Sequence, residues 1–403
     1  CRGSLLPVPC RIVAVAYLLF AAVAFVFVFN AVRPPLTSRS TALRPPWMPV
    51  MITSEVAPLA WIVLVTLAVL AWAIGATGTW IGQFAMALSA LTFLMVSWLV
   101  VRASRTLGVM RASLDGITTV PSPRYQWGRI LYPWPYRIPD AIERLDAIPY
   151  APSLFLDLYR LRRDRKEPAP LLMHIHGGSW GGGDRRQQAQ PLIQEMASRG
   201  WVVVSVDYPL VPEATFPEQV IALHGALRWL RDHAGEYGID ADRMFVTGGS
   251  AGAHLASLVA ITDESSPWSL RHDTEPVVAG AVTMYGVYDL LDRNGIRDFW
   301  PIITTMLIKA DPDLEPEKFH TGSPIDHVSS SAPAFLVVHG RNDSLVPIAE
   351  SDHFVEALSA VAVRPVAYAR LPGATHAFDA VASLRTQQAV AGIAAFLDSA
   401  AGR

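Results

Sequence analysis

The stretch that decides the fold is Gly248-Gly249-Ser250-Ala251-Gly252. It follows an apolar run at 244–246 and precedes apolar residues at helical spacing, so the pattern predicts a sharp turn from a strand into a helix. A serine on such a turn is held exposed, and the flanking glycines let neighbouring backbone approach closely. The arrangement favours acyl transfer through a covalent serine ester. The motif alone is only moderately specific, because glycine-rich turns with serine also occur as plain loops or phosphate-binding bends.

A second glycine-rich stretch lies upstream and reads His174-Ile175-His176-Gly177-Gly178-Ser179-Trp180. It ends a strand-like run at 171–173. A tetrahedral intermediate carries a developing negative oxygen, and glycines allow backbone N–H groups to point at it. The expected oxyanion hole therefore uses the N–H groups of Gly178, Ser179 and Ala251, while Gly177 supports the turn.

The other members of a serine-based triad are expected downstream, in loops that follow strands. The apolar run at 334–339 reads as a buried strand, and Asp343 lies in the loop after it. The alternating run at 366–371 reads as another strand, and His376 lies in the next loop. We therefore expect His376 to take the proton of Ser250 as general base, and Asp343 to orient the imidazole.

Two other acidic residues compete for the role of Asp343. Asp289 also follows a strand-like run, 277–285, and Asp326 lies in a loop that contains a proline. Both residues also fit ordinary roles as a helix cap, a turn residue or a loop hydrogen-bond acceptor. Chain order and a position at a strand end favour Asp343.

Three side chains are candidates for the pocket wall: Trp180, Tyr208 and His254. His254 lies one helical turn after Ser250, where a packed, hydrogen-bonded histidine is the common alternative. His174 and His176 precede the upstream glycines, but no Asp, Glu or Cys accompanies them at metal-ligand spacing. The sequence therefore predicts no metal site and no cofactor.

These motifs, together with the segments 206–213 and 238–243, resemble the hormone-sensitive-lipase branch of the α/β-hydrolases and its near relatives with an HGG-x-W loop. The resemblance covers 148–403 and implies a mostly parallel central sheet flanked by helices. Two departures are Pro209, where the family has arginine, and Ala253 after the elbow. The ending Ser-Ala-Gly-Ala-His is similar instead to feruloyl-esterase-like enzymes, arylformamidases and prenylcysteine methylesterases. The substrate class therefore stays open.

The first quarter of the chain contains three long apolar runs without charge, at 12–29, 57–74 and 81–101. Each is long enough to cross the hydrocarbon core of a bilayer. We therefore expect a membrane region at 1–110 with three spans and a juxtamembrane linker or possible cap at 111–147. The α/β-hydrolase domain is expected at 148–403.

Arginines give the expected orientation of this multi-pass membrane protein. They cluster between the first two runs and after the third, and none lies between the second and third runs. By the positive-inside rule these positions face the cytoplasm, and so does the catalytic domain. The arginines concerned are Arg33, Arg39, Arg44, Arg102, Arg105 and Arg111.

Composition narrows the class of partner. The 403 residues carry a formal net charge of −2, and charges are dispersed after the apolar runs, so nothing indicates nucleic-acid binding. The only cysteines, Cys1 and Cys10, precede the first run and support no disulfide framework or zinc site. The expected partners are a small-molecule or lipid ester and membrane lipids.

The resulting hypothesis is a membrane-anchored serine carboxylic ester hydrolase, an esterase or lipase that acts through an acyl-enzyme on esters of moderate acyl length. An amidase or arylformamidase, or a prenylcysteine-methylesterase-like enzyme, would use the same residues. A catalytically silent scaffold or receptor is the alternative outside enzymes. Because all motifs lie downstream, a chain that begins near Ala112 is expected to keep activity on water-soluble esters.

Overall fold

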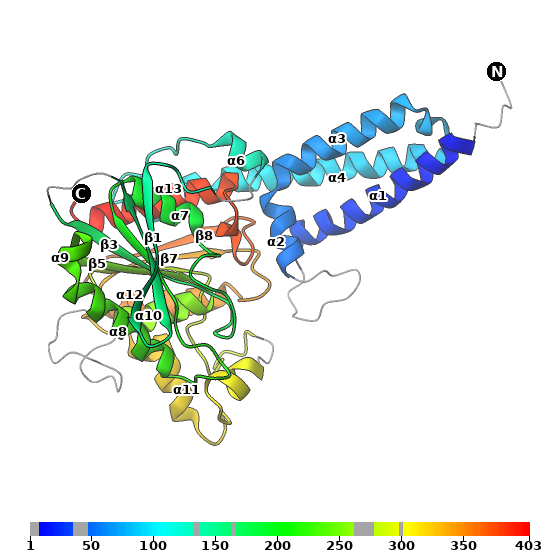
Figure 1. Ribbon diagram of the computed structural model, residues 1–403. Helices are drawn as coiled ribbons and strands as arrows, with labels where there is room; N and C mark the ends of the chain where they lie inside the picture. The colour runs from blue at the N-terminus through cyan, green and yellow to red at the C-terminus, as the bar shows by residue number, and fades with distance from the viewer. Residues whose placement is uncertain (1–7, 35–46, 133–136, 163–166, 262–277, 298–300) are drawn as a thin grey trace.

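The computed structural model describes residues 8–34, 47–132, 137–162, 167–261, 278–297 and 301–403. In this part of the chain, an arm of long helices projects from a domain built on one central sheet (Figure 1). The helical arm consists of α1 (Val8–Val32), α2 (Trp47–Glu55), α3 (Ala57–Ala73) and α4 (Trp80–Ser104).

The central sheet has eight strands in the order β1-β2-β4-β3-β5-β6-β7-β8. The first two pairings, β1 with β2 and β2 with β4, are antiparallel, and the rest are parallel. This mostly parallel sheet confirms the expected α/β-hydrolase fold. The strands are β1 (Ile142–Ala151), β2 (Leu154–Leu161), β3 (Ala169–Ile175), β4 (Val202–Val206), β5 (Ile239–Gly249), β6 (Gly280–Met284), β7 (Ala334–Gly340) and β8 (Val366–Leu371).

Helices cover both faces of the sheet, which explains the near-continuous apolar runs in its strands. Along β3, Leu171 and Met173 pack with α8 (Glu218–Asp232), α10 (Ala251–Ile261) and α12 (Ala349–Val361). The intervening Leu172 packs on the opposite face. That face is covered by α5 (Thr106–Ser113), α7 (Gln190–Ser198) and α13 (Leu384–Ala400).

Several short elements connect these layers. They are η1 (Ala76–Gly78), α6 (Trp127–Leu131), α9 (Ala234–Tyr237), the π-helical turn η2 (Ile303–Leu307), α11 (Pro316–Gly322), η3 (Pro324–His327) and η4 (Phe378–Ala380).

Three helices of the arm, α1, α3 and α4, coincide with the three apolar runs. Among the described residues, two helices are long and apolar enough to cross a membrane, Arg11–Val32 and Trp80–Ser113. The helices Met48–Glu55 and Ala57–Ala73 are long and apolar enough to cross a membrane only when they are counted as one span. A bend of 77° separates them. Three spans therefore remain a prediction.

Apolar clusters between the helices and two hydrogen bonds join the helices of the arm. Tyr17 donates a hydrogen bond to Ser89 Oγ at 2.9 Å, and the Trp61 indole donates one to Ser97 Oγ at 3.0 Å. Many large apolar side chains on the outside of the arm are exposed, including Trp80 at 76%. The arm is therefore apolar both between its helices and on its outer surface, and an apolar outer surface suits a lipid environment.

The linker differs from the expected boundaries. β1 begins at Ile142, ahead of the expected domain start at 148, because its first residues already pair with β2. The described linker residues lie over α7 and α13: Arg129 donates to Gln194 Oε1 at 2.9 Å, and the Gln126 N–H donates to Gln387 Oε1 at 2.8 Å.

Candidate active site

Ser250 occupies the turn between β5 and α10. Its φ is +56°, in the left-handed region, and its N–H donates to Met284 O at 2.9 Å. A Cβ on Gly248 would lie 2.4 Å from the Gly252 carbonyl, and one on Gly252 would lie 2.1 Å from Ile175 O. Only glycine fits these two positions, so the turn presents Ser250 in the strained geometry expected of a nucleophile elbow.

The upstream glycine loop lies beside this elbow. Gly178 and Ser179 have φ of +122° and +53° and line the same cavity as Ser250. The Gly177 N–H donates to Gln188 Oε1 at 2.7 Å, which fits the supporting role expected of that residue. Ala251 is the first residue of α10, where N–H groups point away from the helix.

A buried ion network holds the chain that follows this loop. The carboxylate of Asp157 on β2 accepts hydrogen bonds from Arg144 at 3.0 Å, Arg185 at 2.8 Å and Arg186 at 3.0 Å. Burial would raise the pKa of Asp157, but the Ala147 N–H, Arg185 and Arg186 outweigh it and lower the pKa. Sequence reasoning did not find this network, because its members are scattered along the chain.

Asp343 and His376 meet across the ends of two neighbouring strands. His376 Nδ1 donates to Asp343 Oδ2 at 2.8 Å, and Asp343 Oδ1 accepts the N–H groups of Leu345 and Val346, each at 2.9 Å. Burial would raise the pKa of Asp343, but His376 and His339 outweigh it and bring the pKa well below its usual value. The Asp343 carboxylate therefore stays ionised.

The competing acids lie elsewhere. Asp289 accepts the N–H groups of Leu291 and Arg293, as a capping residue does, and both Asp289 and Asp326 form ion pairs with Arg293. Of the three acids considered, Asp343 is the one that the structure pairs with His376.

Ser250 and His376 open into one cavity of about 190 Å³. Tyr285, at the end of β6, packs its ring edge-on against His376 with centroids 4.7 Å apart, and its hydroxyl donates to Asp379. Burial raises the pKa values of Asp379 and Tyr285. The cavity is lined by Gly178, Ser179, Gln188, Ala189, Ser250, Tyr285, Leu345, His376, Ala377, Asp379 and Ala380.

Tyr285 and Asp379 were missed in the sequence, although each had a signal. Tyr285 directly follows an apolar strand, and Asp379 lies three residues after His376.

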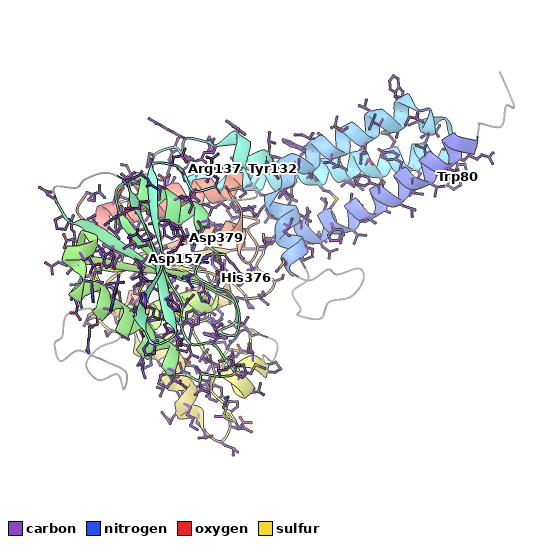
Figure 2. The ribbon with its side chains drawn as sticks, viewed as in Figure 1. Trp80, Tyr132, Arg137, Asp157, His376 and Asp379 are labelled. Atoms are coloured by element: carbon purple, nitrogen blue, oxygen red, sulfur yellow. The ribbon has the colours of Figure 1, made fainter. Side chains whose placement is uncertain are left out.

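Figure 2 shows His376 and Asp379 on the side of the sheet that faces the helical arm. The cavity therefore opens near the base of that arm.

The candidate pocket residues lie outside the lining of this cavity. Trp180 and His254 are buried behind the glycine loop, where the indole N–H donates to His254 Nδ1 at 3.1 Å. His254 Nε2 bonds Gly322 O at 2.7 Å, and burial lowers its pKa to about 4. Tyr208 stacks on His176 and donates to its carbonyl at 3.0 Å. These three side chains support the loop from behind.

His174 and His176 have structural partners. His174 Nδ1 lies 2.9 Å from Ser205 Oγ, and burial together with neighbouring His176 lowers the pKa of His174 to about 3. Within the described residues, no group of three or more His, Cys, Asp or Glu side chains could hold a metal ion.

The chain is similar to known esterases. Residues 156–358 match the BD-FAE family. "Probable carboxylic ester hydrolase LipM" of Mycobacterium tuberculosis is 38% identical over 254 residues, which are 62% of this chain and 58% of LipM. "Esterase LipC" of the same organism is 33% identical over 311 residues, 74% of this chain and 76% of LipC. The match thus spans little more than half of LipM and about three quarters of LipC.

A solved structure shares the fold. The truncated form of a carbohydrate esterase from gut microbiota superposes with a TM-score of 0.56 at 20% identity. The match covers 65% of this chain and 97% of that one. At this identity the likeness concerns the fold alone.

Proposed function

The chain belongs to the BD-FAE family of ester-hydrolysing α/β-hydrolases, and we propose that it is a serine carboxylic ester hydrolase held at a membrane by its helical arm. One observation carries the proposal. Ser250, on its strained elbow, shares a cavity with His376, whose imidazole is hydrogen-bonded to the buried Asp343.

The proposed reaction has two halves. Ser250 Oγ attacks the ester carbonyl carbon while His376 takes the hydroxyl proton, and the carbonyl oxygen becomes an oxyanion facing the N–H groups of Gly178, Ser179 and Ala251. The carbon–oxygen bond to the alcohol then breaks, and His376 returns the proton to the leaving alkoxide. A water molecule, deprotonated by His376, then attacks the acyl-enzyme carbonyl carbon; the bond to Ser250 Oγ breaks, and His376 returns the proton to Oγ as the acid is released.

The charge of Asp343 matters in both halves. Because its low pKa keeps it anionic, it stabilises the imidazolium that forms each time His376 accepts a proton. It also holds the proton on Nδ1, which leaves Nε2 as the basic nitrogen.

The cavity size favours a short acyl group. Its volume of about 190 Å³ lies below the roughly 300–1,000 Å³ of sites for drug-sized ligands. Small and apolar side chains form much of its wall, including Ala189, Leu345, Ala377 and Ala380. We propose esters of short acyl chains as substrates, and a p-nitrophenyl ester series from acetate to octanoate should show kcat/KM falling with chain length.

Three features support a membrane location. The arm exposes apolar side chains, and aromatic residues mark both of its ends: Trp80 lies far from the sheet and Tyr132 lies next to the domain (Figure 2). Arg102, Arg105 and Arg111 follow the third apolar run. We therefore propose that the catalytic domain faces the cytoplasm and meets small or lipid esters there.

A fluorophosphonate probe on the detergent-solubilised full chain tests the nucleophile. The wild type should be labelled, and Ser250→Ala should lose labelling and at least about 10³-fold of kcat. The control is Ser257→Ala, whose hydroxyl donates to Ala253 O inside α10. Wild-type protein that neither reacts with the probe nor cleaves esters would instead indicate a silent scaffold.

A further inference from the structure

The loop that carries His376, residues 372–383 between β8 and α13, is held at its start by the helical arm. Ser54 on α2 donates to Gly373 O at 3.4 Å. Gly373 has a φ of +72°, and a Cβ there would lie 3.2–3.3 Å from the Arg102 side chain of α4. The arm and the start of the loop are therefore in direct contact.

The end of the same loop is held by Glu55, the last residue of α2. One carboxylate oxygen accepts from Ser383 Oγ at 2.7 Å, and the other accepts from Arg385 Nε at 2.9 Å. Arg385 in turn donates to Pro372 O at 2.5 Å. Glu55 and Arg385 thus join the two ends of the loop to each other and to the arm.

This ion pair is closed to solvent. The side chain of Glu55 is 1% exposed and that of Arg385 is 0% exposed. A buried ion pair is sensitive to the loss of either partner, because the other charge is then left without compensation. Glu55 is also the only acidic residue before Asp115 in the sequence, and it lies where the 77° bend separates α2 from α3.

His376 and the cavity residue Asp379 lie on this loop, between its two anchored ends. Asp379 lies three residues after His376 and four before Ser383, and its hydrogen bond from Tyr285 is part of the cavity wall. A shift of the loop end would therefore move the cavity wall and His376 together. A displacement of about 1 Å in a reacting group can cost on the order of 10²-fold in rate.

We infer that Glu55 is a positioning residue for catalysis: through Arg385 and Ser383 it fixes the loop that holds His376 against Asp343 and in the cavity of Ser250. The inference rests on the proposed function, since it takes His376 as the general base. The helical arm is therefore a structural part of the active site as well as an anchor.

This contact changes the expectation for a shortened chain. A chain that begins near Ala112 keeps every catalytic motif but lacks Glu55, so Arg385 loses its buried partner. Such a chain is now expected to lose most of its activity, even on water-soluble esters.

The test measures kcat and KM of the full chain in detergent with p-nitrophenyl acetate, with enzyme concentration fixed by end-point fluorophosphonate titration. Glu55→Gln removes the charge and should lower kcat about 10- to 100-fold with KM changed less than about twofold. Glu55→Asp keeps a carboxylate and should give an intermediate kcat. The control Glu356→Gln makes the same chemical change at an exposed site on α12 and should behave as wild type.

A double-variant cycle identifies the route. If Arg385 transmits most of the effect of Glu55, then adding Glu55→Gln to Arg385→Gln should lower kcat by a much smaller factor than Glu55→Gln does in the wild type. If the kcat losses of the two single variants multiply in the double variant, Glu55 does not act through Arg385.

Three further outcomes would overturn the role of Glu55 or the proposed function. A folded Glu55→Gln protein with kcat within about twofold of wild type would overturn the inference and leave the proposed function standing. If Glu55→Gln does not fold, Glu55→Asp takes its place, and a kcat equal to wild type in that variant would overturn the inference. Wild-type protein without esterase activity would remove both proposals together.

Discussion

His376 Nδ1 and Asp343 Oδ2 lie 2.8 Å apart, although the two residues come from loops after different strands. Both side chains are buried, at 3% and 0% exposure, and Asp343 Oδ2 also lies 3.3 Å from His339 Nε2. β7 and β8 are parallel neighbours, so their carboxyl ends bring the two loops to the same edge of the sheet.

Asp343→Asn is expected to lower kcat about 10²- to 10⁴-fold, because an amide leaves His376 free to adopt the wrong tautomer. Stopped assays with p-nitrophenyl acetate measure this loss. Asp289→Asn and Asp326→Asn serve as controls, since both acids pair with Arg293. A large loss in either control, with Asp343→Asn unaffected, would assign the triad acid to another residue.

Gly178→Ala should lower kcat by about 10²-fold or more, because the loop must move away from the oxyanion. A Cβ at Gly178 would lie 2.2 Å from Gly182 O, and its φ of +122° disfavours any side chain. The matched control is Gly235→Ala on α9, where a Cβ meets nothing within 4 Å. Circular dichroism checks folding, and normal turnover by Gly178→Ala would place the oxyanion hole elsewhere.

Asp379→Asn should change how stability depends on pH. Burial raises the pKa of Asp379 above that of the unfolded chain, which is about 3.9. The contribution of Asp379 is then fully present below that value and is lost as pH rises through the folded-state pKa. The amide does not ionise, so the difference in Tm, variant minus wild type, should increase as the pH rises above about 4.

The control for this measurement is Asp313→Asn, at an exposed position after η2. Its difference in Tm should stay flat over the same pH range. A flat difference for Asp379→Asn as well would contradict the raised pKa.

Cysteine labelling of intact cells tests the orientation. After both native cysteines are replaced by alanine, Val363→Cys on the catalytic domain, 82% exposed, should resist an impermeant maleimide added outside. Gly78→Cys, in the turn between α3 and α4, should react. The opposite pattern would reverse the orientation and leave the proposed chemistry intact.

The sequence by itself determined the features that depend on local backbone geometry. Ser250 needs glycines on both sides, and the upstream loop needs them at Gly177 and Gly178. Both motifs can therefore be recognised from the local sequence alone. Strand-like runs before Asp343 and His376 then placed both residues at one sheet edge, since parallel strands end together.

Only the tertiary structure decided which side chains face one another. Trp180 and His254 were candidates for the pocket, but packing turned them towards each other behind the loop. Tyr285 meets Asp379 across 94 positions of sequence, and Glu55 meets Arg385 across 330. No local pattern encodes such pairs, because a buried charge or hydroxyl takes whichever partner the packed chain brings within hydrogen-bond distance.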